Sequence, residues 1–124
     1  QLPWLDRHTA ARVEAATLYH AGLGDLKDLI VAPLHTDQSH IYGYYPIQYA
    51  DRKELVAYAM SHGRDITMSY HRNCASLPCF REFARACPNA QATADSLIYL
   101  PTYPRYGETE IAKTIAVIRS YFRK

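Results

Sequence analysis

Apolar residues recur with helical spacing at both ends of the chain. Residues 2–23 carry apolar side chains close to a 3.6-residue period, and Gly22 and Gly24 stand where such a helix would end. Near the other end, Ile111 and Ile118 belong to one apolar stripe, with acidic residues before it and basic residues after it. This order of charges suits the dipole of a helix. We therefore expect a long helix at each end.

Three shorter segments have the composition of strands. Residues 40–49 are rich in aromatic and β-branched side chains, and residues 65–70 and 97–100 are shorter segments that also favour a strand. Pro101 and Pro104 prevent the last strand from extending, because proline has no backbone N–H to donate. Residues 25–38 show no clear period, and we expect them to be a connector.

Helices are also expected between these strands. Asp51 is expected to cap one of them, with Glu54 positioned to answer the cap and Gly63 following its last turn. A second is expected to begin at Ser76 with Pro78, to end at Pro88 and to be followed by one or two helical turns in residues 89–96. The residues expected on its buried face are Phe80, Phe83, Ala84 and Cys87.

The order of these elements predicts the fold class. With 124 residues, no internal repeat and no linker, the chain is expected to form one domain. We expect an α/β fold of the two-layer α+β type. It would contain a small three-stranded, largely antiparallel sheet with helices packed mainly on one face, because one such layer of helices buries all the apolar stripes.

The charge distribution limits the kinds of partner, and the cysteine content indicates the cellular compartment. The net charge is +2, and the 14 Lys and Arg residues are scattered among 12 Asp and Glu residues. No basic block exists, so we expect neither a nucleic acid nor an anionic membrane as partner. No apolar run is long enough to span a bilayer. Three cysteines without a regular framework indicate reduced thiols, which suits a cytoplasmic protein.

The densest cluster of polar residues follows the expected second strand. Tyr70, His71, Arg72 and Asn73 supply hydrogen-bond donors, acceptors, a titratable ring and a permanent cation at a strand end, where sites are common. The alternative is a solvated connection between a strand and a helix.

Motifs for catalysis or for a bound group are missing. His71 and the three cysteines lack the paired spacing of compact zinc sites, so we expect no metal. No nucleophile elbow or glycine-rich phosphate loop is present. None of the four lysines, Lys27, Lys53, Lys113 and Lys124, lies in an apolar segment. The chain therefore shows no complete active site of its own.

The chain contains eleven tyrosines but only three phenylalanines. Tyrosine suits surfaces that are partly buried and partly polar, such as interfaces and polar pockets. An independent α/β binding module with a tyrosine-rich surface is therefore one interpretation of the chain.

Four stretches of the chain resemble one enzyme family. The chain resembles the C-terminal small domain of the DegT/DnrJ/EryC1/StrS family of PLP-dependent sugar aminotransferases. The similar stretches are QLPWLDRHTAARVEAATLY (1–19), HIYGYYPIQYADRKELVAYAMSHG (40–63), SYHRNCASLPCF (69–80) and CPNAQATADSLIYLPTYPRYGETEIAKTIAVIRSYF (87–122). The last is the most specific, with its alanine-containing helix, LP-x-YP turn and terminal helix.

This resemblance implies a fragment of a longer enzyme. Residues 1–24 would be the helix that connects the two domains, and residues 25–124 the body of the small domain. The Schiff-base lysine and the other PLP contacts belong to the family's large domain, which the chain would lack. The resemblance therefore implies that the fragment is inactive alone and carries no PLP, no catalytic residue and no metal.

The resemblance also implies the activity of the intact parent. The family transfers an amino group from an amino acid, usually glutamate, to a nucleotide-linked keto sugar in polysaccharide or antibiotic sugar biosynthesis. It works as a homodimer, and the small domain closes one side of the cleft. In many members a histidine follows the second strand. The segment GRDITMSYH departs from the family pattern, but His71 is the best match, with Tyr70 and Asn73 as further substrate contacts.

The turn after residue 100 is expected to be structural. The resemblance places it at the end of the last strand of the small domain, packed on the connecting helix. We expect Tyr103 to be at least half buried, with its ring against the first or last helix, and Arg105 to be exposed.

Overall fold

The computed structural model describes residues 2–35, 37 and 39–123. Its elements in chain order are η1 (Leu2–Trp4), α1 (Leu5–Leu23), β1 (Ile30–Val31), β2 (Tyr45–Gln48), α2 (Arg52–Ser61), β3 (Thr67–Met68), η2 (Cys74–Ser76), η3 (Pro78–Phe83), α3 (Pro88–Ser96), β4 (Leu97–Leu100) and α4 (Glu108–Tyr121), where η denotes a 3₁₀ helix. The expected long helices at the two ends are confirmed.

The strands form one antiparallel sheet in the order β1-β2-β4-β3. The central pair aligns Tyr45 with Leu100, and Ile47 with Ile98. The sheet has four strands among the described residues, so the expected number of three is wrong. The additional strand, β1, is only two residues long and lies in the expected connector. Such a short segment shows no alternation of its own, and only its pairing with β2 makes it a strand.

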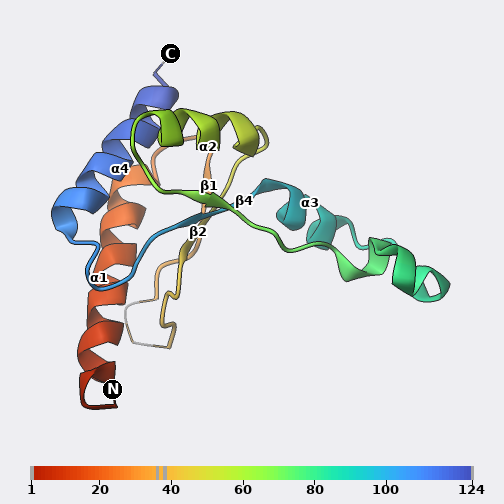
Figure 1. The fold of residues 1–124 in the computed structure, drawn as a ribbon, viewed down its shortest axis with the longest axis horizontal. Coiled ribbons are helices and arrows are strands. Elements are labelled where there is room, and N and C mark those ends of the chain that lie inside the picture. Colours follow the sequence, from red (N-terminus) through yellow and green to blue (C-terminus); the bar gives the residue numbers. More distant parts are fainter. Residues whose placement is uncertain (1, 36, 38, 124) are drawn as a thin grey trace.

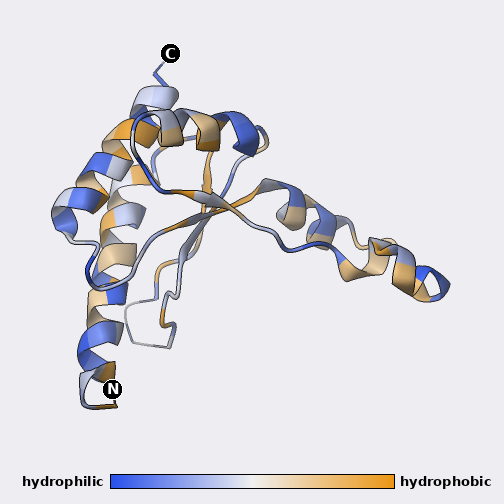
Figure 2. Ribbon diagram, viewed as in Figure 1, coloured by the Kyte–Doolittle hydropathy of each residue, from blue (hydrophilic) through white to orange (hydrophobic). Residues whose placement is uncertain are grey.

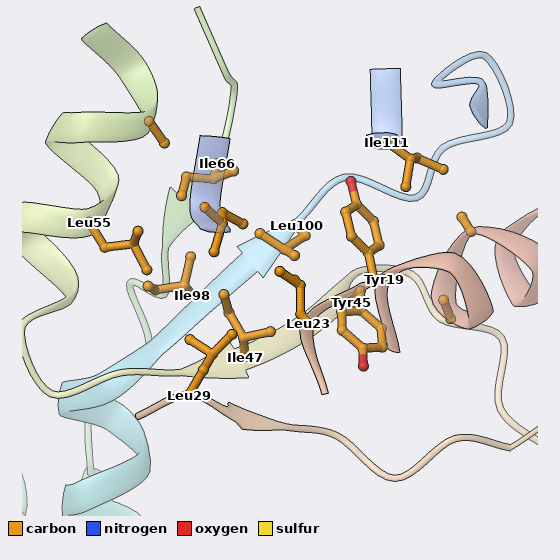
Figure 3. Close-up of a cluster of buried hydrophobic side chains, with 14 of the residues drawn as sticks. Tyr19, Leu23, Leu29, Tyr45, Ile47, Leu55, Ile66, Ile98, Leu100 and Ile111 are labelled. Atoms are coloured by element: carbon orange, nitrogen blue, oxygen red, sulfur yellow. The ribbon is translucent and has the colours of Figure 1, made fainter. Parts of the chain in front are cut away.

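Helices α1, α2 and α4 cover one face of this sheet, as the sequence predicts (Figure 1). Side chains alternate between the two faces of a strand, so β2 and β4 direct Tyr45, Ile47, Ile98 and Leu100 toward these helices, and all four are buried. Figure 3 shows them packed together with side chains from the helices. The remaining positions of the same strands are half buried on the opposite face.

Tyrosine has a large share in the core. Tyr19, Tyr42 and Tyr45 are among the largest fully buried side chains. The rings of Tyr19 and Tyr45 stack at a centroid distance of 5.4 Å. The Tyr19 hydroxyl donates to the backbone oxygen of Pro101 at 3.1 Å. Burial raises the pKa of Tyr19 far above its ordinary value, so this ring is neutral in the folded chain.

The start of α2 differs from the expected cap, whereas its end is as expected. Asp51 does not cap the helix with its side chain; its backbone oxygen instead accepts hydrogen bonds from the amides of Glu54 and Leu55. Gly63 has a φ of +70°, and the amide of Arg64 bonds back to the oxygen of Ala59 at 2.9 Å. This is the left-handed glycine ending that the sequence predicts.

The segment between β3 and β4 extends away from the rest of the chain, and we call residues 70–96 the arm (Figure 1). The expected buried helix in it is wrong. Phe80 and Phe83 are 47% and 74% exposed, and Ala84 and Cys87 are exposed as well. Figure 2 shows apolar residues along the outer part of the arm. This part forms the short 3₁₀ helices η2 and η3.

Pro88 starts α3 and does not end a helix. A proline is well suited to the first turn, where its missing N–H would have no partner inside the helix. The expected helical turns in residues 89–96 are confirmed as part of α3.

The turn after β4 contacts α1, and its purely structural role stays a prediction. Tyr103 is 46% exposed and Arg105 is exposed, as expected, but among the described residues the aromatic contact of the Tyr103 ring is edge-on against Tyr106 of the same turn and not against a helix. Thr102 of the turn is buried, and its hydroxyl donates to the oxygen of Tyr42 at 2.6 Å. Its hydroxyl also accepts a hydrogen bond from Arg12 on α1. The turn is therefore tied to the first helix.

Candidate functional site

The predicted site residues lie at the base of the arm, where β3 leaves the sheet. The amide of Ser69 donates to the oxygen of Leu97 at 3.0 Å and continues the pairing of β3 with β4. The chain then turns outward at Tyr70 and His71, both of which are exposed. A rigid sheet thus places a short polar segment at its edge, which is a common position for a binding site.

His71 is the centre of this segment. Its Nδ1 atom lies 3.0 Å from the Ser69 hydroxyl and 3.0 Å from the Tyr99 hydroxyl. The ring of Tyr70 stacks on the His71 ring at 4.7 Å, while 81% of Tyr70 remains exposed. The structure therefore places Tyr70 and His71 in direct contact, and both line one hollow together with Asn73. It adds Ser69 and Tyr99, which the sequence analysis did not select.

Asn73 has a local structural role. Its side-chain oxygen accepts from the amide of Ala75 at 3.1 Å and caps the 3₁₀ helix η2, which is a typical role for asparagine. Its side-chain nitrogen donates to Gln91 of α3 at 3.3 Å. Asn73 thus holds the two sides of the arm together next to His71.

A polar hollow of about 530 Å³ opens beside His71. Arg52, Arg72, Asn73, Gln91 and Asp95 are among the residues that line it. Arg52 donates to the backbone oxygens of Ala94 and Leu97 at 2.7 and 3.2 Å, so it fixes the end of α3 to the body. The hollow offers several hydrogen-bond donors and is suited to a ligand rich in oxygen atoms.

A second hollow of about 440 Å³ lies on the sheet face that the helices leave uncovered. Its lining includes Arg12, Tyr44, Thr67, Tyr99 and Tyr103. The rings of Tyr44 and Tyr99 stack at 4.9 Å. Tyr99 therefore belongs both to this aromatic hollow and to the hydrogen-bonded group around His71.

The lysines of the described chain lie on its surface, away from the two hollows. Lys27, Lys53 and Lys113 are exposed, and none of them lines either hollow. Lys113 pairs with Glu110 on the surface of α4 at 2.7 Å. A Schiff-base lysine must reach a cofactor inside a site, and these side chains reach solvent. Lys124 lies outside the described residues.

The cysteines are also separate from any metal centre. Cys74, Cys79 and Cys87 are free and exposed on the arm. Within residues 2–35, 37 and 39–123, no three His, Cys, Asp or Glu side chains are placed to hold a metal ion. Among the described residues, no helix is both long enough and apolar enough to cross a membrane.

Several solved structures share this fold, and aminotransferases are among them. DesV from S. venezuelae, in complex with a ketimine intermediate, is 21% identical and aligns with 99% of this chain and 34% of its own, at a TM-score of 0.90. The sugar aminotransferase CalS13 from Micromonospora echinospora is 18% identical over 96% of this chain and 32% of its own, with a TM-score of 0.86. NtdA from Bacillus subtilis, with bound cofactor PMP, is 15% identical over 98% of this chain and 30% of its own, with a TM-score of 0.85.

At these identities the likeness establishes the fold. The chain spans about a third of the length of these structures. No protein with a curated description matches the chain. A model of the DegT/DnrJ/EryC1/StrS aminotransferase family matches residues 1–119, and the chain therefore belongs to this family.

Proposed function

We propose that this chain is the C-terminal small domain of a PLP-dependent aminotransferase that acts on a nucleotide-linked keto sugar. The observation that carries the proposal is the family match over residues 1–119. In this proposal residues 1–24 connect to a large domain that anchors PLP, and the parent is a cytoplasmic homodimer. Glutamate is the expected amino donor.

The contribution of this chain is to bind and orient the sugar substrate. His71, Arg72 and Asn73 line the polar hollow, and Tyr70 stacks on His71. Hydroxyl and phosphate oxygens of a nucleotide-linked sugar accept hydrogen bonds from such donors. PLP, when bound by the large domain, supplies the chemistry of amino transfer.

We expect the 124-residue chain alone to form no specific PLP adduct and to show no transamination. The described lysines are exposed and away from the hollows, so none has the setting that would make it a selective Schiff-base partner. The test is to incubate the chain with PLP, reduce with borohydride and map the modified lysines by mass spectrometry. Stoichiometric labelling of one lysine together with turnover would contradict the proposal.

In the complete enzyme, we expect His71→Ala to raise the KM for the keto sugar about tenfold or more. The loss of one hydrogen bond to a charged or strongly polar oxygen costs about 1.5–3 kcal/mol, which corresponds to such a factor. The half-reaction with the amino donor should change little, because His71 would contact only the sugar substrate. Steady-state and half-reaction kinetics measure both effects.

His62→Ala is the matched control for this experiment. His62 is also exposed, and its Nδ1 contacts Ser61 and the oxygen of Tyr58 at the end of α2, outside the hollow. If both variants changed the KM equally, or if His71→Ala left it unchanged, the assignment of the sugar site to His71 would be wrong.

A further inference from the structure

Two hydroxyl groups converge on one nitrogen of His71. The Ser69 and Tyr99 hydroxyls each lie 3.0 Å from Nδ1, and they lie 3.4 Å from one another. The Ser69 hydroxyl oxygen also accepts a hydrogen bond from the His71 amide at 3.2 Å. Nε2, on the other edge of the ring, has no hydrogen-bond partner among the described residues.

The sheet determines where these two hydroxyls lie. Ser69 is only 5% exposed, and its amide bonds to Leu97 of β4. Tyr99 is a β4 residue whose register partner is Thr67 of β3. Its ring is supported by the stacked ring of Tyr44. The hydroxyls are therefore held by strand pairing, although His71 itself lies in the exposed segment after β3.

A count of hydrogens within the group favours one form of the neutral ring. Each hydroxyl has one hydrogen to donate, and Nδ1 has either a lone pair or a hydrogen. If Nδ1 accepts, one hydroxyl donates to Nδ1 and the other donates to the first hydroxyl, so every hydrogen has an acceptor. If Nδ1 carries the hydrogen, one hydroxyl hydrogen has no acceptor within the group and must turn to solvent instead. The favoured neutral ring therefore carries its hydrogen on Nε2.

We propose that Ser69 and Tyr99 are positioning residues that hold His71 with Nδ1 as acceptor and its Nε2–H free for a ligand. His71 lines the polar hollow, so the group that Nε2–H recognises is an oxygen acceptor such as a sugar hydroxyl, a carbonyl or a phosphate oxygen. The identity of this oxygen as part of a nucleotide-linked sugar rests on the proposed function. The orientation of the ring does not.

The tautomer of His71 can be measured by NMR in the chain labelled with ¹⁵N-histidine. The solution is kept at about pH 8.5, where an ordinary histidine is neutral, and the His71 signals are identified by their loss in His71→Gln. We expect Nδ1 to be fully unprotonated and Nε2 to carry the hydrogen. His8 is exposed and has no hydrogen bond among the described residues, so it reports the ordinary mixture of both forms in the same spectrum.

The double variant Ser69→Ala, Tyr99→Phe should allow the second tautomer of His71 to appear, in a proportion like that of His8. Tyr44→Phe is the matched control, because it removes a hydroxyl from the stacked neighbour without touching Nδ1, and it should leave the His71 spectrum unchanged. Circular dichroism checks that the variants are folded.

The proposal is overturned if wild-type His71 shows the same mixture as His8, or if the folded double variant keeps the wild-type spectrum. If the double variant unfolds, the comparison of the His71 and His8 spectra in the wild-type chain still tests whether His71 is held in one tautomer. This result is independent of substrate. A positioned His71 combined with an unchanged KM in His71→Ala would overturn the substrate role and leave the positioning inference intact.

Discussion

Tyr19→Ala is expected to lower the free energy of unfolding by about 3–5 kcal/mol, as for other large aromatic side chains removed from a core. Tyr19 is fully buried, stacks on Tyr45 at 5.4 Å and donates to the oxygen of Pro101 at 3.1 Å. It thereby joins α1 to the sheet and to the turn after β4. The variant leaves a cavity and an unpaired buried carbonyl. Urea unfolding followed by circular dichroism measures the loss.

Two variants separate the contributions to this loss. Tyr19→Phe keeps the ring and removes the hydroxyl, so it should cost about 1–3 kcal/mol for the carbonyl left without a donor. Tyr103→Ala removes the same side chain from a position that is 46% exposed, and it should cost clearly less than Tyr19→Ala. Equal losses for Tyr19→Ala and Tyr103→Ala would show that α1 does not pack as described.

The stability of the chain is expected to fall as the pH rises above about 10, the ordinary pKa of tyrosine. Burial raises the pKa of Tyr45 to about 12, and it raises the pKa of Tyr19 even more. Both rings therefore stay neutral in the folded chain while the unfolded chain ionises. Their contribution is fully present below pH 10 and is lost as the pH rises toward the folded pKa values. Each ring contributes about 1.4 kcal/mol per pH unit in this window.

Urea unfolding at several pH values between about 8 and 11.5 tests this expectation. The control is the Tyr19→Phe, Tyr45→Phe double variant, which cannot ionise at these positions but shares every other titrating group. We expect a shallower decline in the double variant, measured against its own stability at pH 8. Identical slopes in the two proteins would mean that neither tyrosine is protected from ionisation by the fold.

Local patterns identify the elements that a few neighbouring residues can specify. The apolar stripe with Ile111 and Ile118, together with the charges at its ends, predicts α4, and residues 97–100 predict β4. Gly63 marks the end of α2 because its positive φ is a local requirement of the backbone. Each of these signals lies within a few residues of the structure that it predicts, so the sequence is sufficient.

Local patterns fail where the structure depends on a partner. β1 exists only through its pairing with β2, and the apolar residues Phe80 and Phe83 favour a buried helix although both are exposed in the structure. For the site, sequence reasoning selects His71, since the type and position of the residue are visible. It misses Tyr99, which is 28 positions away and whose alternation with Ile98 and Leu100 is the only signal that places it on the uncovered face.

The sequence by itself determines the terminal helices, the strands with clear composition, the one-sided two-layer arrangement and the likeness to an aminotransferase family. The elements follow from short-range periodicity. The likeness follows from sequence motifs that occur in the same order along the chain as in the family. Tertiary structure alone decides the fourth strand, the exposed arm, the burial of Thr102 and the meeting of Ser69, His71 and Tyr99. The physical reason is that strand register brings distant residues to within hydrogen-bond distance, and register is set by the packing of the whole sheet against its helices.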